Sequence, residues 1–239
     1  YTHAAIFGLF AIITLSYFSP LLDGKKMKQG DIVHFTGASK ELVDFRAEYG
    51  EEALWTNSMF GGMPAFLIST FYKGNLVKMI DHGLKYLFPH PSGAVFLYLL
   101  GFYILMLSLR IDPWLSLLGS LMFAFSSYFF IIIEAGHNTK AFAIGYMPPV
   151  LAGAILTFRK EYLLGGAISA LFLTLQIGAN HFQITYYLAF VIAIFVAFKS
   201  YELIKNKDAR SLIKIGSTLL VVLIIALGLS CAFIVINFI

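Results

Sequence analysis

Asp31 is the first ionisable side chain in this sequence whose position suggests chemistry. It lies within Gln29-Gly30-Asp31, shortly after the first long apolar run ends. A carboxylate held within hydrogen-bond reach of a hydroxyl can take its proton, and Gly30 leaves the backbone free to turn. The sequence therefore predicts Asp31 as a catalytic residue, and a solvated loop acid is the alternative.

A second polar group occupies the loop from Glu134 to Lys140. Glu134 and His137 are three residues apart, which places both on one helical face if the preceding helix continues that far. Oxygen and imidazole ligands suit Mn²⁺ or Zn²⁺, and Glu134 alone would suit Mg²⁺. We therefore expect a divalent cation, such as Mg²⁺ or Mn²⁺, at Glu134 and His137, although two ligands do not complete a metal site.

Lys140 and Asn138 belong to the same loop and are predicted to bind substrate. The ammonium group of Lys140 suits a phosphate or diphosphate as a point charge. Snorkelling of Lys140 to the membrane interface is the alternative.

The third group joins two later apolar runs and contains Asn180, His181 and Gln183. These side chains could bind a sugar or the acceptor, or they could cap two helix ends. Short loops cannot move far from the ends of their helices. We therefore expect the second and third groups at the same bilayer surface, where ionisable residues are costly and tend to be functional.

Apolar runs of helical length separate these groups. The sequence is 59% hydrophobic and 13% charged, far from the roughly one quarter charged that is typical of soluble domains. Runs of about 20 apolar residues predict transmembrane helices. The predicted fold is an all-α integral membrane protein with about seven transmembrane helices, forming one module over residues 1–239. The predicted spans are residues 3–22, 92–110, 113–133, 141–158, 162–179, 182–198 and 212–238.

Basic residues in the short loops predict the orientation. One set of loops is rich in lysine and arginine, whereas the opposite set has only Lys140. The positive-inside rule places the basic set in the cytoplasm, with the N-terminus. The long loop over residues 23–91 then faces outward. The basic set consists of Arg110, Arg159, Lys160, Lys199, Lys205, Lys207 and Arg210.

The long loop is predicted to contain juxtamembrane helices. Ser39 could cap a short helix that has Glu41 in its first turn. Residues 75–88 predict an amphipathic helix with Ile80, Leu84 and Leu87 on one face and charged residues, including Asp81, on the other. It would lie in the membrane interface or pack on the ends of the spans.

Gly61-Gly62, in the segment WTNSMFGGMPAF, predicts a turn flanked by the aromatic residues Trp55, Phe60 and Phe66.

Net charge, cysteine content and the ends of the sequence narrow the classes of protein to which the chain could belong. The net charge of +4 comes mainly from short loops and implies no nucleic-acid partner. A single cysteine, Cys231, excludes an intrachain disulfide. The chain starts without Met and stops in an apolar run, so we expect it to be the N-terminal part of a longer protein.

Four segments together resemble the YfhO-like family of bacterial membrane proteins. They are Gln29-Gly30-Asp31, WTNSMFGGMPAF, EAGHNTK and ANHFQITYY. That family is similar to the membrane-embedded glycosyltransferases of the GT-C class. The resemblance covers the whole sequence, but none of the four segments is a strict catalytic signature.

The resemblance implies a module of seven spans whose first outer loop carries a catalytic acid, which Asp31 matches as general base. It implies transfer of a sugar from a polyprenyl-phosphate donor to a cell-envelope polymer, lipid or protein acceptor. This would occur on the outer face of the bacterial plasma membrane, among membrane lipids. Glu134 and His137 fall where some members place metal-binding or second acidic residues, but the paired acidic dipeptide of some relatives is missing.

Two other functions remain open from the sequence. A transporter or lipid flippase would place ionisable residues or broken helices near the membrane midplane. The span centres are almost purely apolar, apart from Pro148-Pro149 and Gln176. A non-catalytic envelope assembly protein with the same fold is the third hypothesis.

Overall fold

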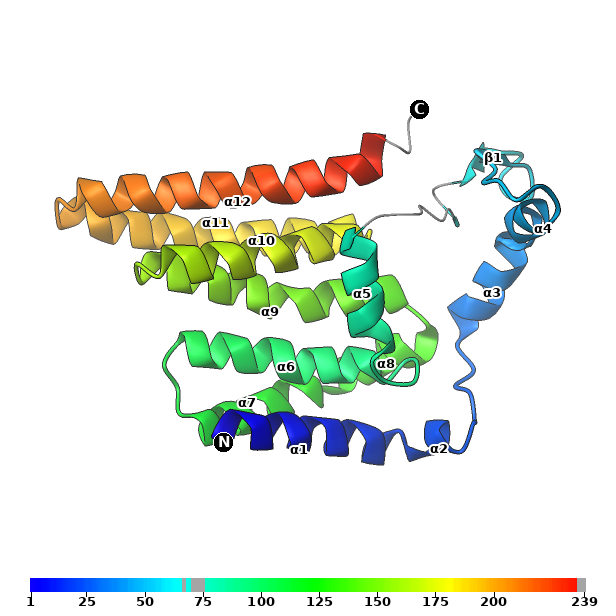
Figure 1. The fold of residues 1–239 in the computed structure, drawn as a ribbon, viewed down its shortest axis with the longest axis horizontal. Coiled ribbons are helices and arrows are strands. Elements are labelled where there is room, and N and C mark those ends of the chain that lie inside the picture. The colour runs from blue at the N-terminus through cyan, green and yellow to red at the C-terminus, as the bar shows by residue number, and fades with distance from the viewer. Residues whose placement is uncertain (66–67, 70–75, 236–239) are drawn as a thin grey trace.

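The computed structural model describes residues 1–65, 68–69 and 76–235 and is helical almost throughout (Figure 1). Among the described residues, three helices are long and apolar enough to cross a membrane: α9, α11 and the Ala209–Ser230 part of α12. The chain is therefore compatible with an integral membrane protein. The described elements are α1 (Thr2–Tyr17), α2 (Ser19–Leu22), α3 (Gly30–Ala38), α4 (Lys40–Tyr49), β1 (Trp55–Thr56), β2 (Met63–Pro64), α5 (Leu76–Tyr86), α6 (Gly93–Ser108), α7 (Pro113–Ala124), α8 (Ser127–Ala135), α9 (Asn138–Phe158), α10 (Tyr162–Gly178), α11 (Phe182–Lys205) and α12 (Ala209–Val235).

Helix α9 forms the centre of the bundle and packs against α6, α8, α10, α11 and α12. Glycines allow the closest of these contacts. A Cβ atom on Gly153 would lie 2.6 Å from the carbonyl oxygen of Gly165, so α9 and α10 meet backbone to backbone. Small residues at helix contacts are the usual way to achieve such packing in membranes. The helix continues through Pro148-Pro149, so this proline pair does not break it.

The predicted apolar runs are helical within the described residues, but two are divided. The first consists of α1 and α2. The third, the span predicted over 113–133, is not one continuous helix, because α7 and α8 are bent by 48° at the break between them. Residues 236–238 of the last predicted span lie outside the described residues.

The first long loop contains more helix than the sequence suggested. Asp31 lies in the first turn of α3, a helix that was not predicted. The predicted helix after Ser39 is present as α4, although the Ser39 side chain makes no capping hydrogen bond. The expected turn at Gly61-Gly62 joins β1 to β2, which pair antiparallel with Trp55 opposite Pro64. Phe66 lies outside the described residues.

Helix α5 is present, but its buried face differs from the expected one. Asp81, predicted on the polar outer face, is only 6% exposed, whereas Ile80 and Leu87 are exposed. Asp81 accepts a hydrogen bond of 2.8 Å from the Tyr146 hydroxyl of α9 and pairs with Lys85 at 2.6 Å. The side chains of Leu76 and Lys78 lie outside the described part of the chain. Pairing allows the charges to face inward, because a buried charge is tolerated only with partners.

Replacing Tyr146 with Phe should destabilise the protein by about 1–3 kcal/mol, because the buried carboxylate of Asp81 loses a donor. The measurement is the midpoint of thermal unfolding in detergent. Tyr186→Phe, at an exposed position of α11, is the matched control and should leave the midpoint unchanged. Equal midpoints for the two variants would mean that the Asp81 contact does not hold α5 on the bundle.

Candidate functional site

The chain segments that carry the predicted site residues meet at one end of the bundle. Helix α3 contacts α8, and the α8–α9 turn lies at the same end as the α10–α11 turn (Figure 1). Gly136 makes the α8–α9 turn possible, because its φ of +94° is unfavourable for residues with a Cβ. A Cβ there would lie 3.1 Å from the Cβ atoms of Asp31 and Gln29. The first loop therefore lies directly against this turn.

Gln29 holds these segments together. Its side chain is buried and donates to the carbonyl oxygen of Ile133, at the end of α8. Its amide also forms a reciprocal pair with the amide of Asn138, with both contacts at 3.3 Å. His90 Nε2 lies 3.2 Å from Gln29 Oε1, which brings in the segment before α6. A buried side chain with all these partners fixes the position of the residue that follows it by two, Asp31.

Asp31 and His137 form the central contact of the site. His137 Nδ1 lies 2.5 Å from Asp31 Oδ2, and the two side chains are 48% and 50% exposed, respectively. His137 stands immediately before α9, and Asp31 lies in the first turn of α3. The second carboxylate oxygen and the imidazole Nε2 are then two positions at which the pair can accept or donate a proton. An exposed pair of this kind is accessible to a bound substrate.

Gly136→Ala should destabilise the protein by about 1–3 kcal/mol, because alanine is strained at this φ and its Cβ crowds Asp31 and Gln29. Thermal unfolding in detergent measures the effect. The control is Gly178→Ala at the end of α10, where a Cβ meets nothing within 4 Å. A loss at Gly178 as large as that at Gly136 would contradict the role given to this turn.

His181 and Lys140 extend the site toward the α10–α11 turn. Ala143 of α9 packs with Ala179 and Ile184, and this contact brings the turn against the start of α9. Burial, followed by the charges of Lys140 and His137, holds the pKa of His181 below its ordinary value of 6.5. Its Nε2 is buried without a hydrogen-bond partner among the described residues. A neutral imidazole with an unused nitrogen can bind a hydroxyl group.

The remaining predicted substrate-binding residues have other contacts. Lys140 Nζ lies 5.3 Å from the ring centroid of Tyr128, a cation–π contact. The Asn138 amide is occupied by Gln29. Asn180 is exposed and has a φ of +57°, as a turn residue, whereas Gln183 Nε2 donates to the Tyr187 hydroxyl within α11 at 2.8 Å. Of the predicted substrate-binding residues, His181 is the one whose pKa is affected by both His137 and Lys140, which places these three side chains in one electrostatic environment.

Lowering the pH should destabilise the protein partly through His181. Its lowered pKa means that the folded state binds a proton less readily than the unfolded state. The stabilisation is complete above about pH 6.5 and is lost as the pH falls through the folded-state pKa. Unfolding midpoints measured from pH 8 to pH 5 should fall in the wild type and fall less in His181→Gln. His34→Gln, at an exposed position of α3, is the control and should match the wild type.

The donor set does not fit the expected divalent cation. Helix α8 ends at Ala135, and the turn at Gly136 removes the shared helical face assumed for Glu134 and His137. His137 Nδ1 is directed to Asp31 instead. Within residues 1–65, 68–69 and 76–235, no group of three or more His, Cys, Asp or Glu side chains could hold a metal ion.

The sequence reasoning did not identify Gln29 and His90 as parts of the site. Gln29 stood out only as the neighbour of Gly30, and a buried amide cannot be distinguished from an exposed one by residue type. His90 lies in the sequence far from Asp31, and only the tertiary contact to Gln29 reveals its position. Its pKa is lowered by burial and by Lys85, which favours the neutral ring in this contact.

Comparison with protein-family models, with curated proteins and with solved structures finds no match to this chain.

Proposed function

We propose that the chain crosses the membrane seven times, with α1, α6, the bent pair α7–α8, and each of α9 to α12 as spans. Three of these helices are of spanning length by themselves, and the bent pair passes the same test when taken together. Helices α1, α6 and α10 are apolar but only 16 or 17 residues long. The seven proposed spans run in alternating directions along the bundle, which supports this arrangement (Figure 1). Asp31, His137 and His181 would then lie on the extracytoplasmic side.

The function that this site supports best is glycosyl transfer from a polyprenyl-phosphate-linked sugar to a cell-envelope acceptor. The observation that carries the proposal is the contact of 2.5 Å between Asp31 and His137 at one end of an apolar bundle. The two residues come from loops more than 100 residues apart in sequence. Transfer from a lipid-borne sugar donor requires, at the membrane surface, a group that takes the proton of the acceptor hydroxyl. We also propose that the chain is related to the YfhO-like family and to the GT-C class, and that it lies in the bacterial plasma membrane.

The proposed reaction needs one base and one cation. Asp31 takes the proton of the acceptor hydroxyl, and the resulting oxygen attacks the anomeric carbon of the sugar. The bond between that carbon and the phosphate oxygen breaks, and its electron pair leaves with the polyprenyl phosphate. Lys140, three residues after His137, is the cation that would offset the charge gained by the phosphate. His137 orients the carboxylate, and the unused Nε2 of His181 binds a sugar or acceptor hydroxyl.

Transport is less well supported than transfer. The unbroken course of α9 through Pro148-Pro149 provides no broken helix at the membrane midplane. Gln176 of α10 is buried and its amide has no hydrogen-bond partner in the described part of the chain, but it is a single uncharged group. The exposed pair Asp31–His137 lies at the bundle end, where chemistry needs it and a midplane transport site does not.

The test is turnover by the purified full-length protein in proteoliposomes that contain a radiolabelled polyprenyl-phosphate sugar and a membrane extract as acceptor source. We expect labelled product together with release of polyprenyl phosphate. A dithionite-quenched fluorescent polyprenyl-phosphate sugar in parallel vesicles reports movement across the bilayer. Movement without product would favour a flippase, and binding without turnover would favour the assembly protein.

A further inference from the structure

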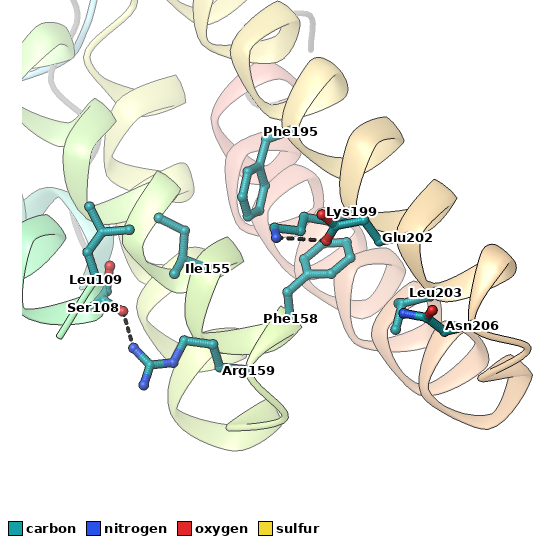
Figure 2. Close-up of a pocket in the computed structure, with 10 residues that line it drawn as sticks. All are labelled: Ser108, Leu109, Ile155, Phe158, Arg159, Phe195, Lys199, Glu202, Leu203 and Asn206. Carbon is teal, nitrogen blue, oxygen red and sulfur yellow. Dashed lines mark hydrogen bonds and ion pairs between the residues drawn. The ribbon is translucent and has the colours of Figure 1, made fainter.

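The end of the bundle opposite Asp31 contains a cavity with two basic side chains and apolar walls. Its volume is about 360 Å³, and α6, α9 and α11 line it. Figure 2 shows Arg159 on one side and Lys199 beside Glu202 on the other, with Phe158 and Phe195 contributing to the apolar wall. The cavity thus combines cations with a hydrocarbon surface.

The charges in the cavity suit a single negative charge. Arg159 Nη1 donates to the carbonyl oxygen of Ser108 at 2.5 Å, which fixes the guanidinium at the cavity wall. Lys199 Nζ pairs with Glu202 Oε2 at 2.8 Å. Two cations and one carboxylate leave one net positive charge. A phosphodiester carries one negative charge, and the planar guanidinium matches the geometry of its oxygens.

A second cavity lies toward the bundle centre and is lined by the same three helices and by Phe123 of α7. It has a volume of about 260 Å³, and carbon-rich side chains such as Leu105, Leu151 and Val191 line it. The lining positions on each helix continue from one cavity to the next in steps of three or four residues, which keeps them on one face. From Ile144 to Phe158 this face of α9 extends about 21 Å. This exceeds the roughly 15 Å of hydrocarbon in one leaflet.

We propose that the groove formed by these two cavities binds an anionic phospholipid, with its phosphodiester between Arg159 and Lys199 and one acyl chain along α6, α9 and α11. Basic pockets between membrane helices on the cytoplasmic side are suited to such head groups. The apolar second cavity can hold an acyl chain, which a phospholipid has and a free phosphate lacks. The inference requires a bilayer around the helices, but it does not depend on glycosyl transfer, because the groove and Asp31 lie at opposite ends of α9.

The experiment exchanges the full-length protein into nanodiscs of equal parts phosphatidylglycerol and phosphatidylcholine and identifies the retained lipids by native mass spectrometry. Wild type should retain phosphatidylglycerol in preference to phosphatidylcholine. Lys199→Gln should reduce this preference about fivefold, and Glu202→Gln should increase it, because each changes the net charge of the cavity by one in opposite directions. The matched control is Lys205→Gln, which removes an exposed charge of the same helix outside the cavity and should change nothing.

Excess inorganic phosphate should not displace the retained lipid, because it cannot occupy the apolar second cavity. Leu151→Trp fills that cavity and should lower the retention of phospholipid without changing its charge preference. Equal retention of the two lipids by wild type would overturn the proposal, as would equal effects of Lys199→Gln and Lys205→Gln. Displacement by inorganic phosphate, or by polyprenyl phosphate at equal concentration, would also overturn it.

Discussion

Replacing Asp31 with Asn should lower sugar transfer by about 10²- to 10⁴-fold, the usual contribution of a general base. Asparagine keeps the size and a hydrogen-bonding oxygen for His137, but its amide cannot take the proton of the acceptor. Release of polyprenyl phosphate in proteoliposomes measures the rate. Donor binding should be retained, because the loss concerns the chemical step.

The matched control for this variant is Asp44→Asn, in α4 of the same loop. Asp44 is exposed and, within residues 1–65, 68–69 and 76–235, pairs with Lys40 alone, one helical turn away at 2.5 Å, so its removal should change stability and activity little. The free energies of unfolding of both variants should equal that of the wild type within about 0.5 kcal/mol. Unimpaired transfer by Asp31→Asn would remove this carboxylate from the mechanism, whereas equal losses at both positions would point to damage of the loop.

The sequence was sufficient to locate most of the apolar helices and to bring Asp31 near the EAGHNTK loop, but not to locate α3. Long apolar runs leave the backbone no partner in lipid other than its own helix, so their helical state follows from composition alone. Loop length then limits where a polar residue can lie. His137 and His181 were expected at one end of the bundle for this reason, and the contact at Asp31 agrees with it.

The finer contacts depend on tertiary packing that composition does not encode. The division between α7 and α8 falls inside a continuous apolar run, where hydropathy is uniform. The positive φ at Gly136 could not be foreseen, because many glycines in membrane helices adopt ordinary helical angles. Asp81 was placed outside because an unpaired charge favours water, and only Tyr146 and Lys85 make its buried position stable.

His137→Phe should lower transfer by about 10²-fold while unfolding at the wild-type midpoint. The phenyl ring cannot donate to Asp31 Oδ2, so the carboxylate loses the contact that fixes its direction. A displacement of about 1 Å in a reacting group is enough for a loss of this size. The measurement is kcat for polyprenyl phosphate release, compared with KM for the donor, which should change much less.

Two amide substitutions separate the orientation of Asp31 from direct proton transfer by His137. The side-chain nitrogen of Asn can occupy the position of Nδ1 and donate to Asp31, whereas that of Gln reaches the position of Nε2. If His137 orients Asp31, His137→Asn should restore activity to within about tenfold of wild type, and His137→Gln should stay as low as His137→Phe. The acid limb of the pH–rate profile should remain in His137→Asn, because this variant leaves the base, Asp31, unchanged. Loss of that limb, with all three variants as inactive as Asp31→Asn, would instead make His137 Nε2 the proton acceptor and Asp31 the residue that orients it.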